Sequence, residues 1–255
     1  MSRILKYIFY DLFKTRFILL YFSFLLISSF AMYQLDSDPS KVILSLMNIL
    51  LLVVPLVSIV FSTIHFYNSY EFIELMLAQP VDRKTVFLSQ YIGVGLSLSI
   101  AFVAGTGLPV LIYGLDTIST TMVWTGFILT WVFVSLAFLA SVLTRDKAKA
   151  MGVAILLWFY FSLIYDAFLL WVVYTFGDYP LESPMLILIS LNPVDLARVI
   201  MLLKMDISAL MGYTGAFFKE FFHSHTGTLY SAGILLLWAI LPVLLSLYIF
   251  RKKDI

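Results

Sequence analysis

Long apolar stretches alternate along this chain with shorter polar segments. Six stretches cover residues 17–34, 42–67, 86–113, 120–143, 150–176 and 229–250, and Asp166 is the only Asp, Glu, Lys or Arg within them. A helix needs roughly 20 apolar residues to cross the ~30 Å hydrocarbon core of a bilayer, whereas strands of outer-membrane barrels alternate over only ~10 residues. The pattern predicts an all-α integral membrane protein with six transmembrane helices, which form a single domain over residues 1–255.

Composition narrows the class of protein further. Of the 255 residues 62% are hydrophobic and 12% are charged, and the mean hydropathy is +1.01, so a soluble fold with a polar surface is excluded. A net charge of +1 leaves no basic excess with which to bind nucleic acid. The absence of Cys excludes disulfides, thiolate nucleophiles and Cys-based metal sites.

The positions of Lys and Arg predict the orientation, because cytoplasmic loops are enriched in both residues. With the N-terminus inside, twelve of them lie in the cytoplasm and four on the opposite side. The twelve are Arg3, Lys6, Lys14, Arg16, Arg83, Lys84, Arg145, Lys147, Lys149, Arg251, Lys252 and Lys253, and the four are Lys41, Arg198, Lys204 and Lys219. We therefore expect both termini in the cytoplasm.

Residues 2–16 show the pattern of a short basic amphipathic helix. The apolar residues that recur at helical spacing are Ile4, Leu5, Ile8, Phe9, Leu12 and Phe13. Such a helix typically lies in the membrane interface. The alternative is that this segment only extends the first span into water.

A second amphipathic helix is predicted in the cytoplasmic loop 68–82. Glu71 and Glu74 share one face of it, and Phe72, Leu75, Met76 and Gln79 fall on another. Pro80 ends the helix, and Asp82 is placed to cap the next helix at Arg83 or Lys84. The result is a rigid projection that a partner can bind, unless the segment is only a linker that rests on the membrane.

The loop 177–228 on the outer side is long enough to contain helices of its own. Asn192, Pro193 and Asp195 have the chemistry of a helix start: an N-cap, a proline at the first helical position and an acid in the first turn. We expect a mostly buried helix here, preceded by a membrane-dipping segment at 185–189.

Asp166 is the one acidic residue embedded in an apolar stretch, roughly 24 Å from the cytoplasmic end of its span. It must face protein or water. One interpretation is a proton or ion relay. The other is a hydrogen bond to a neighbouring loop, with the helix start at residues 192–195 as the candidate, because no Lys or Arg lies within the spans.

Motifs for catalysis are missing. No Gly-x-x-x-x-Gly-Lys-Ser/Thr loop and no His-Glu-x-x-His motif occurs, so we expect neither ATPase nor protease activity in this chain. Met201, Met205, His223 and His225 are candidate copper ligands on the outer side. Met is also a common filler of apolar helices, which is the alternative.

Several of these segments resemble the permeases of type-2 ABC exporters. The residues Glu74-Leu75-Met76-Leu77, followed by Pro80-Val81-Asp82-Arg83, are similar to the coupling loop of that family, although Phe72-Ile73 replaces its usual Gly-Thr. Six spans, an amphipathic N-terminal helix and a helical outer loop before the last span also resemble the family. Tyr165-Asp166 and the segment from Leu191 to Asp195 look most like the permeases of transporters that mature nitrous oxide reductase.

This resemblance implies a function in the bacterial inner membrane. The permease would be a homodimer that binds no cofactor itself, while two copies of a separate cytoplasmic ATPase bind ATP and Mg²⁺ and dock at the coupling loop. A copper-handling periplasmic subunit would bind the outer loops. The docking residues would be Glu71, Glu74, Leu75, Met76, Gln79, Pro80 and Arg83, and the transmission residues Tyr165, Asp166, Asn192, Pro193 and Asp195. The alternatives are an exporter of a lipid, peptide or drug, and a membrane anchor or assembly factor that transports nothing.

Overall fold

A computed structural model of the chain describes residues 2–36, 38–144, 146–177, 179, 182–204 and 225–252, and every regular element among them is helical. Six helical segments are long and apolar enough to cross a membrane, which confirms the predicted all-α, six-span architecture. They are α2 (Arg16–Leu35), α3 (Pro39–Asn68), α5 (Arg83–Tyr113), α6 (Thr117–Leu143), the series α7 (Lys147–Phe159), η1 (Tyr160–Ile164) and α8 (Tyr165–Thr175), and α12 (His225–Lys252).

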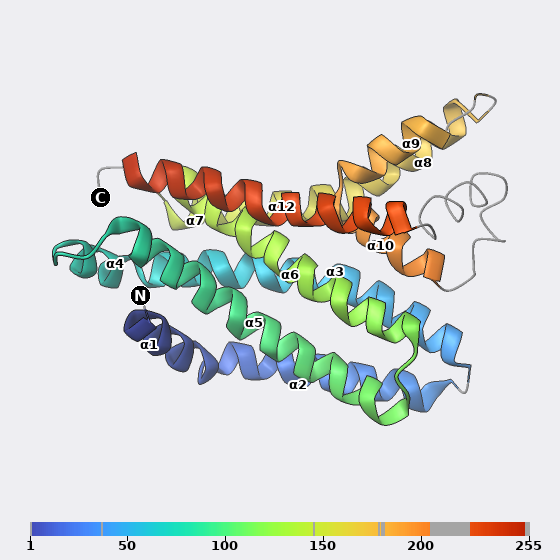
Figure 1. Cartoon of the computed structure of the whole chain (residues 1–255), viewed down its shortest axis with the longest axis horizontal. Helices are drawn as coiled ribbons and strands as arrows, with labels where there is room; N and C mark the ends of the chain where they lie inside the picture. Colours follow the sequence, from blue (N-terminus) through green and yellow to red (C-terminus); the bar gives the residue numbers. More distant parts are fainter. Residues whose placement is uncertain are drawn as a thin grey trace.

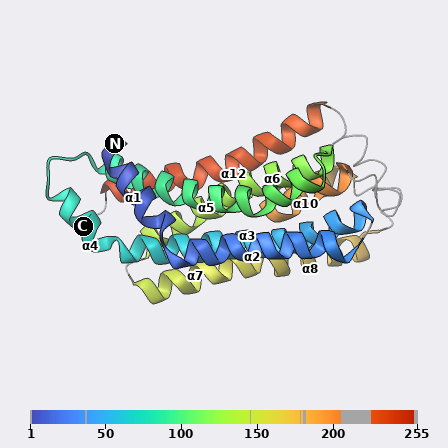
Figure 2. The same ribbon diagram turned by 90° about the horizontal axis from the view of Figure 1, so that it is seen from below.

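Four shorter helices lie at the two ends of the bundle. Helices α1 (Ser2–Phe13) and α4 (Tyr70–Leu77) lie at the same end as both chain termini (Figure 1). Helices α9 (Glu182–Ser190) and α10 (Pro193–Lys204) lie toward the opposite end. The view in Figure 2 shows the same separation of α4 from α10 along the long axis. With the predicted orientation, the first end is cytoplasmic.

Helix α6 forms the centre of the core. It packs against α12, α3, α5, α10 and α7, and most of its residues are buried. Several of its buried hydroxyls donate to the carbonyl oxygen four residues earlier, as Thr130 does to Gly126 at 2.9 Å and Ser141 to Ala137 at 2.8 Å. A small polar residue is therefore tolerated in an apolar helix without an unpaired donor.

Aspartates begin four of the helices. The carboxylate of Asp38 accepts from the Ser40 amide, that of Asp82 from Lys84, that of Asp116 from Ser119 and that of Asp146 from Ala148. Each bond satisfies one of the free amides in the first helical turn. The predicted cap at Asp82, with α5 beginning at Arg83, is confirmed.

The N-terminal segment is a helix of its own and not a straight extension of the first span. Helix α1 ends at Phe13, and Thr15 has extended backbone geometry before α2 begins at Arg16. Ile8 and Leu12 are buried, because α1 packs against α5 at Gly93, where a Cβ would lie 2.7 Å from Cγ2 of Ile8. Its position in the membrane interface stays a prediction.

Candidate functional site

The first candidate site is α4, at the end of the bundle that holds both termini. Ile73 is its buried residue, with 1% of its surface exposed, and it anchors the helix to the ends of α3 and α5. The ring of Phe72 stacks on Tyr7 of α1, with 6.1 Å between centroids. Helix α4 is therefore fixed on one side by protein.

The other side of α4 faces away from the protein. Of the predicted docking residues, Glu71, Glu74, Leu75, Gln79 and Pro80 are exposed, whereas Met76 and Arg83 are partly buried. The sequence analysis placed Leu75 with Phe72 and Met76, but the structure separates them, because the buried stripe of this short helix centres on Ile73. Leu75 is 66% exposed and lies beside the exposed Glu71 and Glu74, where it offers an apolar surface to a partner.

Helix α4 is joined to α3 by one residue. Ser69 is both the last cap of α3 and the first cap of α4: its amide donates to the His65 carbonyl at 2.9 Å, and its carbonyl accepts from the Ile73 amide at 2.9 Å. The ammonium group of Lys147 donates to the side-chain oxygen of Asn68 at 2.7 Å. The single connecting residue leaves little chain between α4 and α3.

The second candidate site is the elbow between α9 and α10, where the two helices are bent by 115°. As predicted, α10 begins at Pro193 with Asn192 as its cap, since the Asn192 side-chain oxygen accepts from the Val194 amide at 2.9 Å. Asn192 is completely buried and Asp195 is 3% exposed. The apolar helix α9 occupies the segment for which a membrane-dipping element was predicted.

The elbow is bonded to the fifth span. The Asn192 side-chain amide donates to the Phe161 carbonyl at 2.8 Å and to the Asp195 carboxylate at 2.6 Å. The Tyr165 hydroxyl donates to the Leu188 carbonyl in α9 at 2.7 Å. Phe161 lies in η1, a π-helical turn, and such turns interrupt the regular α-helical ladder and are frequent at functional sites.

Asp166 has a basic partner, which corrects the sequence analysis. Arg198 of α10 forms an ion pair with Asp166, and the same nitrogen lies 3.1 Å from Asp195. Two carboxylates therefore share one guanidinium group. We expected Asp166 to bond to the helix start at residues 192–195; the helix is the right one, but the bond is made by a residue one turn further along.

Helix α12 also holds the elbow, and this was not anticipated. The Trp238 indole donates to the Ser190 carbonyl at 3.1 Å, and its ring meets Phe161 edge to face, with 5.4 Å between centroids. The Ser190 hydroxyl lies 3.0 Å from that of Tyr230. The elbow is thus hydrogen-bonded to two different spans.

Of the four candidate copper ligands, only Met201 has a described side chain. Met201 is buried in the core at 2% exposure. Met205 and His223 lie outside the described residues, as does the side chain of His225. No cluster of three or more His, Cys, Asp or Glu that can hold a metal ion occurs in the part of the chain that the structure describes.

A six-span helical bundle, with an exposed helix at one end and a hydrogen-bonded elbow at the other, fits the membrane subunit of a transporter. The family model of ABC-2 family transporter proteins matches residues 18–255, so the chain belongs to that family. It is a permease, with the membrane-spanning role of its class.

Two relatives share the name "Probable ABC transporter permease protein NosY". The protein from Stutzerimonas stutzeri is 33% identical over 138 residues, which are 49% of each chain. The protein from Pseudomonas aeruginosa is 31% identical over 150 residues, which are 54% of each chain. The chain is thus matched over about half the length of these relatives.

Proposed function

We propose that this permease couples ATP hydrolysis by a separate cytoplasmic ATPase to work at the outer side of the membrane. The observation that carries the proposal is that α3 contacts both α4 and α10, the helices of the two candidate sites. It continues into α4 through Ser69, and in its middle the Leu52 carbonyl accepts a bond from the Trp158 indole at 3.2 Å. Trp158 lies two residues before the π-helical turn whose Phe161 carbonyl bonds Asn192.

The mechanism is mechanical. Closure of an ATPase dimer pushes α4, α3 moves with it, and α3 carries the π-turn and the elbow of α9 and α10. The size of the shift is limited by how much more tightly the ATPase binds one permease state than the other. The chain acts as a homodimer, because a symmetric ATPase dimer needs two copies of α4.

The work at the outer side is the maturation of the copper sites of nitrous oxide reductase. The similarity to two proteins named NosY supports this assignment, together with the resemblance of Tyr165-Asp166 and the segment from Leu191 to Asp195. A periplasmic copper-handling subunit binds at the outer loops in this proposal. Rearrangement of the elbow changes the shape that this subunit meets.

The test is made in cells from which the chain has been removed. We expect nitrous oxide reductase to be exported but deficient in copper, and copper content to return with the wild-type chain. Normal copper content in the deletion strain would contradict the maturation role. It would favour export of a lipid, peptide or drug, or a role as an anchor.

Replacement of both Met201 and Met205 by Leu tests whether copper binds to this chain. Leu preserves side-chain volume but removes both thioethers, at a cost usually below ~1.5 kcal/mol. Under the mechanical proposal the double variant restores copper content as the wild type does. Loss of copper content with an intact ATPase complex would place the metal path in this chain.

A further inference from the structure

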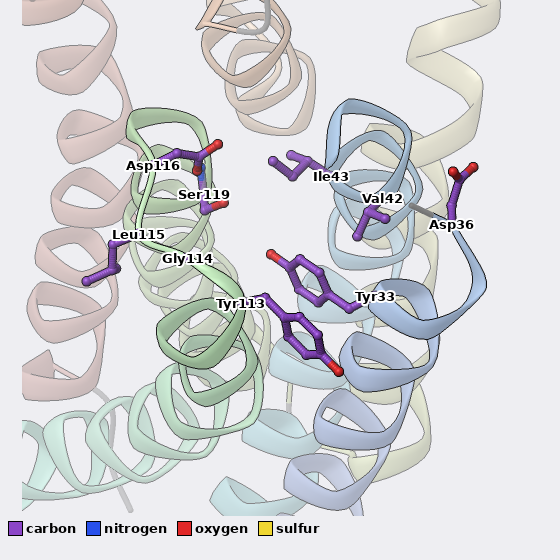
Figure 3. Close-up of a pocket in the computed structure, with 9 residues that line it drawn as sticks. All are labelled: Tyr33, Asp36, Val42, Ile43, Tyr113, Gly114, Leu115, Asp116 and Ser119. Atoms are coloured by element: carbon purple, nitrogen blue, oxygen red, sulfur yellow. The ribbon is translucent and has the colours of Figure 1, made fainter. Parts of the chain in front are cut away.

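A pocket of about 380 Å³ opens at the end of the bundle away from α4 (Figure 3). It lies where α2 ends, α3 begins and α5 turns into α6. Its walls are formed by Tyr33, Asp36, Val42, Ile43, Tyr113, Gly114, Leu115, Asp116 and Ser119. The pocket is separate from both candidate sites above.

The pocket has the chemistry of a site for an organic cation. The rings of Tyr33 and Tyr113 stack with 4.5 Å between centroids, and the Gln34 amide holds the Tyr113 hydroxyl at 3.0 Å. Asp116 points into the pocket from the start of α6, whereas Asp36 lies beyond Val42 with its carboxylate pointing away from the tyrosine rings (Figure 3). Among the described residues, both ion pairs involve Arg198, so neither carboxylate is neutralised by a Lys or Arg.

An apolar groove adjoins the pocket. It has a volume of about 540 Å³ and runs between α5 and α6, with walls that include Ile100, Val103, Gly107, Leu111, Val123 and Phe127. Gly107 leaves room in it, since a Cβ there would meet only Val103, at 3.8 Å. Leu115 lines both the groove and the pocket, so the two spaces meet at the loop between α5 and α6.

The adjoining groove indicates which kind of organic cation the pocket binds. Its walls belong to two helices that are long and apolar enough to cross a membrane, so we expect the groove to face lipid. A metal ion or a partner's lysine would leave the apolar groove empty, whereas the acyl chain of a lipid can fill it. A primary ammonium can donate to the Asp116 carboxylate and contact the tyrosine rings.

We propose that the pocket binds the protonated amine of a phosphatidylethanolamine lipid while an acyl chain lies in the groove between α5 and α6. This places a specific lipid at the outer ends of four spans. The site does not depend on the ATPase or copper roles, because it shares no residue with α4 or with the elbow of α9 and α10.

Native mass spectrometry of the purified chain tests the head-group preference. Phosphatidylethanolamine should remain bound at detergent concentrations that remove phosphatidylglycerol, which has no amine. In the variant Asp116→Asn, the affinity for phosphatidylethanolamine should fall by about tenfold, the size expected for losing a charge-assisted bond. Asn caps helices as well as Asp does, so α6 keeps its start.

The matched control is Asp38→Asn. Asp38 also caps a helix at this end of the bundle but does not line the pocket, so its replacement should leave lipid retention unchanged. Equal retention of both lipids by the wild-type chain would overturn the proposal, and so would an unchanged preference in Asp116→Asn. Should Asp116→Asn fail to fold, Asp116→Ser, which also caps helices, provides the same test.

The groove has its own variant. Gly107→Leu fills the space between α5 and α6 and should weaken retention of the whole lipid without affecting binding of free ethanolamine. Gly152→Leu is the control, because Gly152 is exposed on α7 with no atom near its Cβ position. Unchanged lipid retention in Gly107→Leu would refute the acyl-chain assignment. The assignment would also be refuted if free ethanolamine bound the wild-type chain as tightly as phosphatidylethanolamine does.

Discussion

Asn192 donates its side-chain amide to the carbonyl oxygen of Phe161 at 2.8 Å, although the two residues are 31 positions apart in the chain. The bond joins the elbow between α9 and α10 to the π-helical turn of the fifth span. Because Asn192 also caps α10 and is completely buried, the two elements cannot separate without leaving a buried polar group unpaired. In the proposed mechanism, this bond carries a displacement of the fifth span to the elbow.

Replacement of Asn192 by Leu should destabilise the chain by about 2–4 kcal/mol, because it removes a helix cap and leaves the Phe161 carbonyl unpaired. Thermal unfolding in detergent measures the effect. The matched control is Asn48→Leu, the same substitution at an exposed position of α3, which should cost little or nothing. Equal stability of the two variants would show that the bond to Phe161 contributes nothing.

Asp166 distinguishes a structural link from an ion relay. Asp166→Asn keeps an acceptor for Arg198, so we expect nearly wild-type coupling of ATP hydrolysis to the outer partner, whereas Asp166→Leu should uncouple them. Stability should change by less than ~1 kcal/mol in both variants, because the pair is partly exposed and Arg198 keeps Asp195. A relay predicts instead that Asn fails as badly as Leu.

The features that were predicted correctly are local in the sequence. The spans are visible as apolar stretches, and the caps at Asp82 and Asn192 follow from residues two or three positions apart. The pairing of Arg198 with Asp166 joins residues 32 positions apart, and its only local signal is the spacing of Arg198 three residues after Asp195. The π-turn at residues 160–164 has the sequence Tyr-Phe-Ser-Leu-Ile, which also suits an apolar α-helix, so it was missed.

Reversal of both Glu71 and Glu74 to Lys should release the ATPase during purification while the permease remains folded. Each carboxylate lies exposed on α4, and a charge-assisted bond at an interface contributes roughly 1.5–3 kcal/mol. The control is Asp11→Lys, a charge reversal at an exposed position of α1 at the same end, and this variant should retain the ATPase. Retention of the ATPase at normal stoichiometry in the double variant would refute the assignment of α4.

The orientation can be tested directly because the chain has no Cys. Single cysteines at Asp36 and Asp116 should react with a membrane-impermeant maleimide added to intact cells, and one at Lys147 should react only after lysis. All three positions are exposed in the structure. Labelling of Lys147 alone in intact cells would invert the topology.

The central claim is that a movement at α4 reaches the elbow through the π-turn. Spin labels on cysteines at Ile187 of α9 and Leu244 of α12, both exposed, report the position of the elbow relative to the bundle. Labelled chains are diluted with unlabelled ones in the ATPase complex, so that only distances within one chain are measured by pulsed electron paramagnetic resonance. We predict that the distance distribution shifts when ATP is bound and that Asn192→Leu abolishes the shift while the ATPase still binds. A distribution that ATP leaves unchanged in the wild type, or a full shift in Asn192→Leu, would contradict the account.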